Sequence, residues 1–395
     1  MQHEHLFIKN QAATPAYVFD MDQMRERITM VREMLGERVK LCYAMKANPF
    51  VIQAIQQEID CYEVCSPGEQ KICERAGIDM KKVVLSGVYK ARKDIAYVMD
   101  TYGAQLTYTA ESYNQFLLLH ELAKERKLHI RVLLRVTSGN QFGMDEQILR
   151  EIITQRSQYE AIDIIGIQHF SGTQRKRLSQ YKEELCYVDE LLLSLKEQTG
   201  YEAKHIEFGP GFYVEYFQQE KTYDEKELLK GFAALIDQLH FQGTITLELG
   251  RFLSAACGTY YTQIVDQKHN DGIDYCIVDG GMHQVNYFGQ RMAMKIPYYQ
   301  HLYEGDRQGN LQFYHICGSL CTVNDHLVKQ LPLLHAQVGD ILAFKNTGAY
   351  SMSEGASLFL SRDLPKIYLY DQENGLTLMR DRFETNVLNY KYEGE

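Results

Sequence analysis

Hydrophobic positions along the N-terminal two thirds of the chain repeat one arrangement: a short continuous apolar run, a tip with polar or glycine residues, and an amphipathic segment. The runs do not alternate apolar with polar residues, which is typical of parallel strands buried on both faces. Eight such units in about 220 residues predict a (β/α)8 barrel. The predicted strands are Val39–Tyr43, Cys61–Val64, Val83–Leu85, Gln105–Tyr108, Ile130–Val136, Ile164–Phe170, His205–Phe208 and Thr244–Leu247.

The segments between these runs have helical spacing. A first helix is expected over Gln23–Leu35, with Asp20 or Asp22 as its N-cap. The clearest later helices are predicted at Ser112–Arg126, Asp145–Arg156, Leu178–Thr199 and Glu225–Leu239. An open, doubly wound sheet is the alternative, but it would usually carry a GxGxxG motif after its first strand, and none stands there. Barrel enzymes place their chemistry at the carboxyl ends of the strands, so the strand tips are the candidate site.

The pattern changes after about residue 253, where short strands are separated by turns such as Asn270-Asp-Gly and Asp279-Gly-Gly. This half is predicted to be an antiparallel β domain, completed by an N-terminal strand near Ala16. We therefore expect a barrel domain over residues 24–252 and a β domain over residues 1–23 and 253–395.

Composition narrows the classes of function. The 395 residues carry a net charge of −10 and no Lys/Arg cluster, which argues against a nucleic-acid surface. No apolar run is long enough to span a membrane, and the first residues lack the form of a secretory signal. Nine cysteines without a CxxC pair predict free thiols in the cytoplasm and no metal site.

Lys46 is the first candidate for chemistry. It follows the apolar run Val39–Tyr43, stands among small residues and precedes Pro49. An amine that a strand end directs into a cavity is partly desolvated, which lowers its pKa, and a neutral amine can form a Schiff base with an aldehyde. On this stretch alone, a surface lysine at a strand end is an equally good interpretation.

Two later tips contain the glycine turns Phe170-Ser-Gly-Thr-Gln and Gly209-Pro-Gly-Phe. Such turns expose backbone N–H groups that suit a phosphate, although each could also be an ordinary tight turn. The last predicted strand ends in Glu248-Leu-Gly-Arg251, which places a carboxylate and a guanidinium at the barrel mouth. A structural ion pair is the alternative there.

Eight motifs, in order, resemble the fold-type III, pyridoxal-phosphate-dependent amino-acid decarboxylases, the group of the diaminopimelate and ornithine decarboxylases. The resemblance spans essentially the whole chain, and it implies an alanine-racemase-like fold, pyridoxal 5′-phosphate as cofactor, and a homodimer with shared active sites. The motifs are Tyr43-Ala-Met-Lys-Ala-Asn, Glu63-Val-Cys-Ser-Pro-Gly-Glu, Leu85-Ser-Gly-Val, Gln141-Phe-Gly-Met, Gly209-Pro-Gly-Phe, Glu248-Leu-Gly-Arg, Gly318-Ser-Leu-Cys-Thr-Val-Asn-Asp and Gly348-Ala-Tyr.

By this resemblance, Lys46 holds the cofactor covalently and Glu248 contacts its pyridine nitrogen, so that the ring can accept the electron pair left by CO2. Cys321 matches a cysteine that the partner subunit supplies and that helps to protonate the product carbon. Cofactor binding is assigned to Lys46, Phe170, Thr173, Gly209, Gly211, Glu248, Gly250, Arg251 and Tyr350. Substrate contacts are assigned to Arg251, Arg291, Thr322 and Tyr350.

Three departures from the family pattern matter. Phe170 takes the place of a histidine that stacks on the cofactor, and strand alternation should turn His169 away. Pro210 removes one N–H donor from the phosphate turn. Thr322 replaces the acid that, in the diaminopimelate and ornithine enzymes, holds a distal ammonium group, so a free diamino acid loses its charged partner.

Two segments resemble one branch of the family: Phe359-Leu-Ser-Arg362, and the long segment 286–297 that contains Arg291. That branch holds the L-glutamyl-[acyl-carrier-protein] decarboxylase and the decarboxylases of siderophore pathways. The resemblance implies an amino-acid substrate with a conjugated side chain, which an acyl-carrier protein could deliver.

Three rivals remain open. The nearest is a diaminopimelate decarboxylase with an unusual distal contact. An alanine-type racemase shares the fold, but Glu248 and Cys321 argue against it. A cofactor-free binding protein is disfavoured because Lys46, Glu248, Arg251 and Cys321 are all retained.

Overall fold

The computed structural model describes residue 4 and residues 12–220, 223–287 and 292–391. Contacts divide the chain into two compact units. The barrel unit comprises Glu26–Tyr213 and Tyr223–Leu253, and the β unit comprises Met1–Arg25, Val214–Thr222 and Ser254–Glu395. The boundaries proposed from sequence place residues 214–222 in the barrel domain. In the structure this segment belongs to the β unit.

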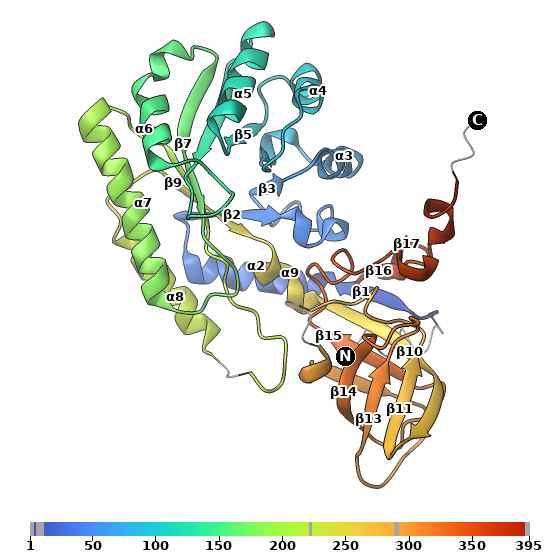
Figure 1. The fold of residues 1–395 in the computed structure, drawn as a ribbon. Coiled ribbons are helices and arrows are strands. Elements are labelled where there is room, and N and C mark those ends of the chain that lie inside the picture. The colour runs from blue at the N-terminus through green and yellow to red at the C-terminus, as the bar shows by residue number, and fades with distance from the viewer. Residues whose placement is uncertain (1–3, 5–11, 221–222, 288–291, 392–395) are drawn as a thin grey trace. The chain divides into compact units, whose positions relative to one another are not determined.

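The predicted (β/α)8 barrel is confirmed. Its eight strands are all parallel and close through the pairing of the first with the last, in which Val39 lies opposite Ile245 (Figure 1). In chain order they are β2 (Val39–Ala44), β3 (Cys61–Val64), β4 (Val83–Leu85), β5 (Thr107–Ala110), β6 (Ile130–Arg135), β7 (Ile162–Phe170), β8 (His205–Gly209) and β9 (Thr244–Leu249).

One strand was misplaced. β5 begins at Thr107, two residues after the predicted start, because Gln105 belongs to the turn that ends the preceding helix. Gly103 caps that helix with a φ of 61°, and the Gln105 N–H donates to the Tyr102 carbonyl.

From β3 onward each barrel strand is followed by an α-helix, whereas α2 precedes β2 and only short 3-10 turns follow β2 (Figure 1). They are α2 (Met21–Leu35), α3 (Pro67–Arg75), α4 (Arg92–Tyr102), α5 (Tyr113–Glu125), α6 (Glu146–Thr154), α7 (Leu178–Thr199), α8 (Glu225–Asp237) and α9 (Arg251–Ser254). α3 and α4 were not among the helices named from the sequence, although α3 has a clear start signal. Ser66 accepts the Glu69 N–H, Pro67 opens the helix, and the Glu69 carboxylate reaches back to the Cys65 N–H.

The β unit is built on one sheet in which most, but not all, neighbouring strands are antiparallel. The central path runs β14-β13-β11-β10-β1-β16-β17, and β15 joins β10 to β12. Its strands are β1 (Ala16–Asp20), β10 (Gly258–Asn270), β11 (Ile273–Val278), β12 (Tyr299–Leu302), β13 (Gln312–Cys317), β14 (His326–Leu333), β15 (Ile341–Lys345), β16 (Lys366–Asp371) and β17 (Gly375–Arg380).

The N-terminal strand near Ala16 completes this sheet, as predicted, by pairing with β10 and β16. The sheet is mixed, however, since β1 with β16 and β11 with β13 are parallel pairs. Within the described ranges, no helix has the length and apolar character needed to cross a membrane.

Candidate active site

Lys46 lies in a one-turn 3-10 helix, η1 (Met45–Ala47), that ends β2. Met45 and Ala47 are buried, whereas the Lys46 side chain is 43% exposed. Its Nζ donates to Glu63 Oε2 on the neighbouring strand β3 at 2.7 Å. The fold therefore presents the amine at the carboxyl end of the barrel, above a carboxylate that is only 3% exposed.

Glu63 and Cys65 form the base of the amine site. The Cys65 thiol donates to Glu63 Oε1 at 3.2 Å and lies 3.6 Å from Lys46 Nζ. Burial would raise the pKa of Glu63, but Lys46, the thiol and Arg135 together hold it below its ordinary value. Burial and the Glu63 charge raise the pKa of Cys65, so the sulfur stays protonated. Glu63 is therefore an anion that fixes both neighbours.

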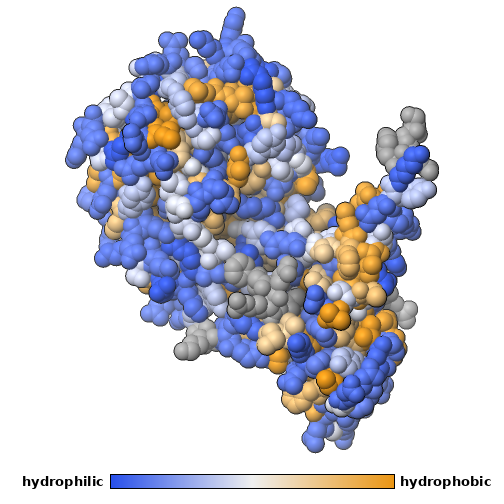
Figure 2. Space-filling view, viewed as in Figure 1, coloured by the Kyte–Doolittle hydropathy of each residue, from blue (hydrophilic) through white to orange (hydrophobic). Residues whose placement is uncertain are grey.

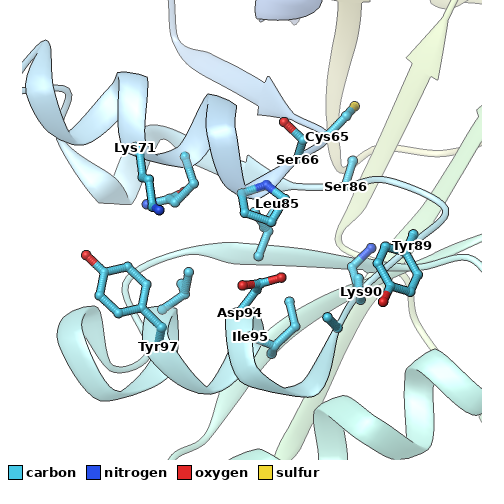
Figure 3. A pocket seen from close by; sticks show the side chains of 14 residues that line it. Cys65, Ser66, Lys71, Leu85, Ser86, Tyr89, Lys90, Asp94, Ile95 and Tyr97 are labelled. Carbon is cyan, nitrogen blue, oxygen red and sulfur yellow. The ribbon is translucent and has the colours of Figure 1, made fainter. Parts of the chain in front are cut away.

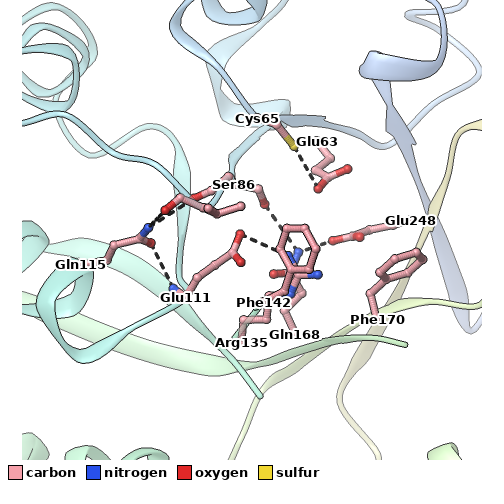
Figure 4. Close-up of polar contacts among 12 residues, drawn as sticks. Glu63, Cys65, Ser86, Glu111, Gln115, Arg135, Phe142, Gln168, Phe170 and Glu248 are labelled. Atoms are coloured by element: carbon pink, nitrogen blue, oxygen red, sulfur yellow. Dashed lines mark hydrogen bonds and ion pairs between the residues drawn. The ribbon is translucent and has the colours of Figure 1, made fainter. Parts of the chain in front are cut away.

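A buried amide, Gln168, links two further carboxyl groups, and Figure 4 shows it beside one of them, Glu248. Gln168 on β7 is 1% exposed, and its Nε2 donates to Glu248 Oε1 on β9 and to Glu207 Oε1 on β8, the latter at 3.1 Å. Burial raises the pKa of Glu207 well above its usual range, and the charge of Glu248 raises it further. Burial followed by the Glu63 charge also raises the pKa of Glu248.

These two carboxyl groups are not equivalent. Glu207 is completely buried, whereas Glu248 is partly exposed. The proton is assigned to Glu207 because it is the fully buried member of the pair and burial raises its pKa well above the usual range. Glu248 is then the carboxylate at the mouth of the barrel, and Gln168 together with protonated Glu207 supports it from below.

An ion pair closes the opposite wall of the site. Arg135, at the end of β6, lies 3.1 Å from a carboxylate oxygen of Glu111, which directly follows β5. Both side chains are more than nine-tenths buried, and the Arg135 guanidinium lies over the Phe142 ring at 4.9 Å. Because the two charges are opposite, the pair places charged groups at the barrel mouth without changing the net charge there.

The two glycine turns predicted to bind phosphate are brought together. The Arg175 N–H donates to the Gly211 carbonyl at 2.9 Å. A Cβ added to Gly211, whose φ is 58°, would lie 2.0 Å from the Gly172 carbonyl oxygen. Only glycine permits this approach, which leaves the exposed Thr173 hydroxyl beside the second turn.

The chain also packs closely against two flanking glycines. A Cβ on Gly209 would lie 2.4 Å from the Phe170 ring, and one on Gly250 would lie 3.0 Å from Ala47 Cβ, next to Lys46. Arg251 follows Gly250 as the first residue of α9 and is half-buried. The predicted positions from β7, β8 and β9 thus converge on the end of β2.

The end of β7 alternates as expected. His169 is 3% exposed and packs between Phe208 and Tyr187 of α7, with ring centroids 6.0 Å apart in each case. Burial lowers its pKa. Figure 4 shows Phe170 beside Gln168 and Glu248, on the inner side. The aromatic ring and not the imidazole therefore faces the site.

The remaining predicted residues belong to the β unit. Cys321 is exposed and Thr322 is half-buried in the turn between β13 and β14. Asp325 fixes this turn by accepting the Met282 and Leu320 N–H groups, each at 2.8 Å. Tyr350 has a φ of 65°, a left-handed conformation that bulky residues rarely adopt. Arg291 lies outside the described residues.

Several functional candidates were missed by sequence reasoning: Glu111, Arg135, Gln168 and Glu207 were not singled out, and Glu63 received no role. Each is a polar residue that lies within, or directly after, a largely apolar strand of the barrel. That signal was available, because a buried charge must be paired to be tolerated.

A cavity of about 260 Å³ lies on the rim between α3 and α4, bordered by Cys65 and Ser86 (Figure 3). Lys71 and Asp94 line opposite sides of it. At one end Lys90 is buried and donates to the Gly87 carbonyl at 2.8 Å, and burial lowers its pKa to about 8. The cavity is a separate space beside the amine site.

Comparison with known proteins gives a family match and several full-length relatives. The family model described as pyridoxal-dependent decarboxylase, pyridoxal binding domain, matches residues 21–255. The L-glutamyl-[BtrI acyl-carrier protein] decarboxylase of Niallia circulans is 26% identical, over 92% of this chain and 90% of its own. A diaminopimelate decarboxylase of Campylobacter jejuni is also 26% identical, over 96% of both chains.

A third relative is the 2-[(L-alanin-3-ylcarbamoyl)methyl]-2-hydroxybutanedioate decarboxylase of Staphylococcus aureus, which is 25% identical over 89% of this chain and 93% of its own. Among solved structures, the diaminopimelate decarboxylase of M. jannaschii with L-lysine has a TM-score of 0.84 and 23% identity, covering 97% of this chain and 93% of that chain. The structural likeness supports the same fold.

Proposed function

Because the chain belongs to the pyridoxal-dependent decarboxylases, we propose that it removes the α-carboxyl group of an amino acid whose side chain is conjugated to another group. As a family member, it is a carboxy-lyase that uses pyridoxal 5′-phosphate. When bound, this cofactor supplies a ring that takes up the electron pair released with CO2. The chain's own residues bind and orient that group and move protons around it.

The residues of the barrel mouth fit this cofactor. Lys46 offers an amine for covalent attachment, and the turns at Gly172 and Gly211, which approach so closely that Gly211 cannot carry a Cβ, are proposed to present backbone N–H groups to the phosphate. Thr173 and Tyr350 are proposed as further phosphate contacts, and Arg251 as a phosphate or substrate contact. The strained φ of Tyr350 supports a functional role, since strained backbone persists where surrounding structure and function demand it.

Glu248 is proposed to hold a proton on the ring nitrogen. It needs negative charge to do so, and two features keep that charge in place. The Gln168 amide donates to it, and Glu207 below it is protonated and adds no second charge. Glu63 stays anionic and keeps the Lys46 amine oriented. Phe170 can stack on the ring but cannot exchange a proton with it.

The substrate proposal is carried by Thr322, which follows Cys321 at the position assigned to the distal end of the substrate. A hydroxyl gives a distal ammonium group no charge to pair with. Two of the relatives are named for conjugated amino acids, one linked to an acyl-carrier protein and one to a hydroxybutanedioate. An acyl-carrier protein is therefore a candidate partner of this chain.

The second candidate is decarboxylation of free diaminopimelate, which a relative of equal identity favours. Steady-state kinetics would decide between them. Losing a charge-assisted hydrogen bond costs about 1.5–3 kcal/mol, or about ten- to a hundredfold in kcat/KM. We expect meso-diaminopimelate to be poorer than a citryl-diamino acid or a γ-glutamyl thioester by that factor. A higher kcat/KM for diaminopimelate than for every conjugate would reject the proposal.

A homodimer with shared sites is the proposed assembly. Apolar side chains lie exposed on the β unit around η7 (Phe359–Ser361) and η8 (Thr385–Leu388), where Figure 2 shows apolar surface. The Asn389 side chain donates to the Leu358 carbonyl and ties the two segments together. A contiguous apolar surface of this kind is typical of an interface.

A further inference from the structure

The β unit contains a cavity that borders Cys321 and that the reaction described above does not use. Its volume is about 610 Å³, in the range of sites for small molecules. Four segments of the β unit enclose most of it: Ala13–Pro15, the turn that follows β11 up to Gln284, the turn Gly318–Cys321, and Arg362–Lys366. All its lining residues belong to this one unit.

The acids that line the cavity are already engaged. Asp279 accepts hydrogen bonds from the Thr14 and Thr262 hydroxyls and from the Gln263 N–H. Asp363 pairs with Arg382 at 2.5 Å, and Asp266 lies 3.7 Å from Lys268. Asp363 and Asp266 are therefore each paired with a cation of the same cavity, whereas Asp279 keeps its charge and its oxygens are occupied by the protein's own neutral donors.

Arg362 is different from the other cations of the cavity. Lys366 has Asp381 at 3.0 Å, whereas no carboxylate of the described residues lies within ion-pair distance of Arg362. Its guanidinium donates to the Ser319 carbonyl at 2.8 Å, beside Cys321. Asp325 feels the Arg362 charge, but both of its oxygens accept backbone N–H groups. Arg362 thus has donors for an anion.

His283 is the second unusual group. It lines the cavity and is 2% exposed, yet neither ring nitrogen has a hydrogen-bond partner among the residues the structure describes. Burial, with a contribution from Arg362, lowers its pKa to about 4, so the ring is neutral and carries one N–H. A buried polar group without a partner is costly, and a ligand could satisfy it.

We propose that this cavity binds the anionic end of the conjugated side chain, a carboxylate or a phosphate, with Arg362 as its ion-pair partner and His283 as a hydrogen-bond donor. The inference rests on the proposed function, because Cys321 connects the cavity to the reaction. Arginine gives paired, charge-assisted hydrogen bonds to either anion. The proposed subsite also accounts for the neutral residue Thr322. The positive charge of Arg362 would select an anionic side-chain end, so no acid is needed beside Cys321.

Calorimetry on the holoenzyme tests this directly with two probes, citrate and 4′-phosphopantetheine. We expect one of them to bind, which identifies the tail as polycarboxylate or phosphate. Arg362→Ala should weaken that binding about tenfold or more, because a hydrogen bond to a charged group is lost. Arg362 is exposed, so the variant should fold. His283→Leu should also weaken binding, and His283→Asn, which keeps a donor, less so.

Two matched controls remove a cation elsewhere. Lys71→Ala alters the cavity between α3 and α4, and Lys329→Ala alters an exposed position on β14. Both should leave binding unchanged. Failure of both probes to bind, unchanged binding in Arg362→Ala, or an equal loss of binding in a control variant would overturn the subsite.

Kinetics separates this subsite from the proposed function. With an anionic conjugate, Arg362→Ala should raise KM about tenfold and leave kcat nearly unchanged, while a neutral side-chain amide should show no change in KM. Turnover of conjugates without an effect of Arg362→Ala overturns only the subsite. Anion binding that depends on Arg362, without turnover of any conjugate, supports the subsite and rejects the proposed substrate.

Discussion

Glu207 is a fully buried carboxyl group that no sequence motif marks, and its proton is central to the charge of the site. Burial and the neighbouring charge of Glu248 raise its pKa far above that of an unfolded glutamate. Between the unfolded pKa of about 4.3 and the raised folded pKa, the folded protein binds more protons than the unfolded chain. The free energy of unfolding therefore falls as the pH rises through this window.

Glu207→Gln should remove this dependence, because the amide is neutral at every pH and can still donate to Glu248. We expect the melting temperature of the variant to fall less than that of wild type between about pH 5 and pH 7. Each pKa unit corresponds to about 1.4 kcal/mol, or about 3 °C for a domain of this size. Cofactor absorbance should be retained.

Glu207→Leu is the control, since it leaves the Gln168 amide with one acceptor fewer and should lower the melting temperature at all pH values. An equal pH dependence in Glu207→Gln and wild type would contradict a protonated Glu207.

At the scale of elements, the site depends on how closely its turns approach one another. Gly211→Ala places a methyl group 2.0 Å from the Gly172 carbonyl oxygen and should separate the two phosphate turns. We expect cofactor affinity to fall by about tenfold or more, since the variant loses at least one hydrogen bond to a charged group. Titration of the apo-enzyme with cofactor, followed by absorbance, measures this.

Gly77→Ala is the matched control for Gly211→Ala. Gly77 has a similar φ of 67°, but an added Cβ would meet nothing within 4 Å. Gly77→Ala should lower the free energy of unfolding by about 1 kcal/mol, because alanine is disfavoured in the left-handed conformation. Its cofactor affinity should be unchanged. A cofactor affinity of Gly211→Ala equal to that of Gly77→Ala and wild type would show that the approach of the two turns does not determine binding.

The sequence predicted the positions of the barrel strands better than the pairing of strands in the β unit. The barrel strands are continuous apolar runs, so their positions followed from patterning, and β5 shifted only because Gly103 and Gln105 close a helix that was not foreseen. The parallel pairing of β1 with β16 joins segments some 350 residues apart, as in Ala16 opposite Lys366, and no local pattern specifies it.

The residues of the candidate site fall into the same two groups: those found in local motifs, and those whose role depends on distant segments. Lys46, Glu248 and the glycine turns stand in local motifs and were found there. Gln168 and Glu207 were not, since their importance arises only where three strands bring an amide between two carboxyl groups. Arg362 appeared in a motif, but the cavity around it depends on four distant segments.

At the scale of the whole molecule, the active site proposed here requires two chains, because Lys46 and Cys321 are assigned to different subunits of one site. The Lys46→Ala variant should lose the cofactor's absorbance band and its activity, since covalent attachment is removed. The Cys321→Ala variant should keep the band and lose most of its turnover. Each homodimer is then damaged at both of its sites.

Mixing the two variants under conditions of subunit exchange should restore activity. A mixed dimer has one site with Lys46 from one chain and Cys321 from the other, both intact, and a second site that lacks both. Random pairing makes about half of the dimers mixed, so about a quarter of wild-type activity should return. Exchange is verified independently with differently tagged chains, and wild type mixed with Lys46→Ala calibrates the assay. If exchange occurs and activity does not return, Cys321 acts within its own chain or not at all, and the shared site is rejected while the family assignment stands.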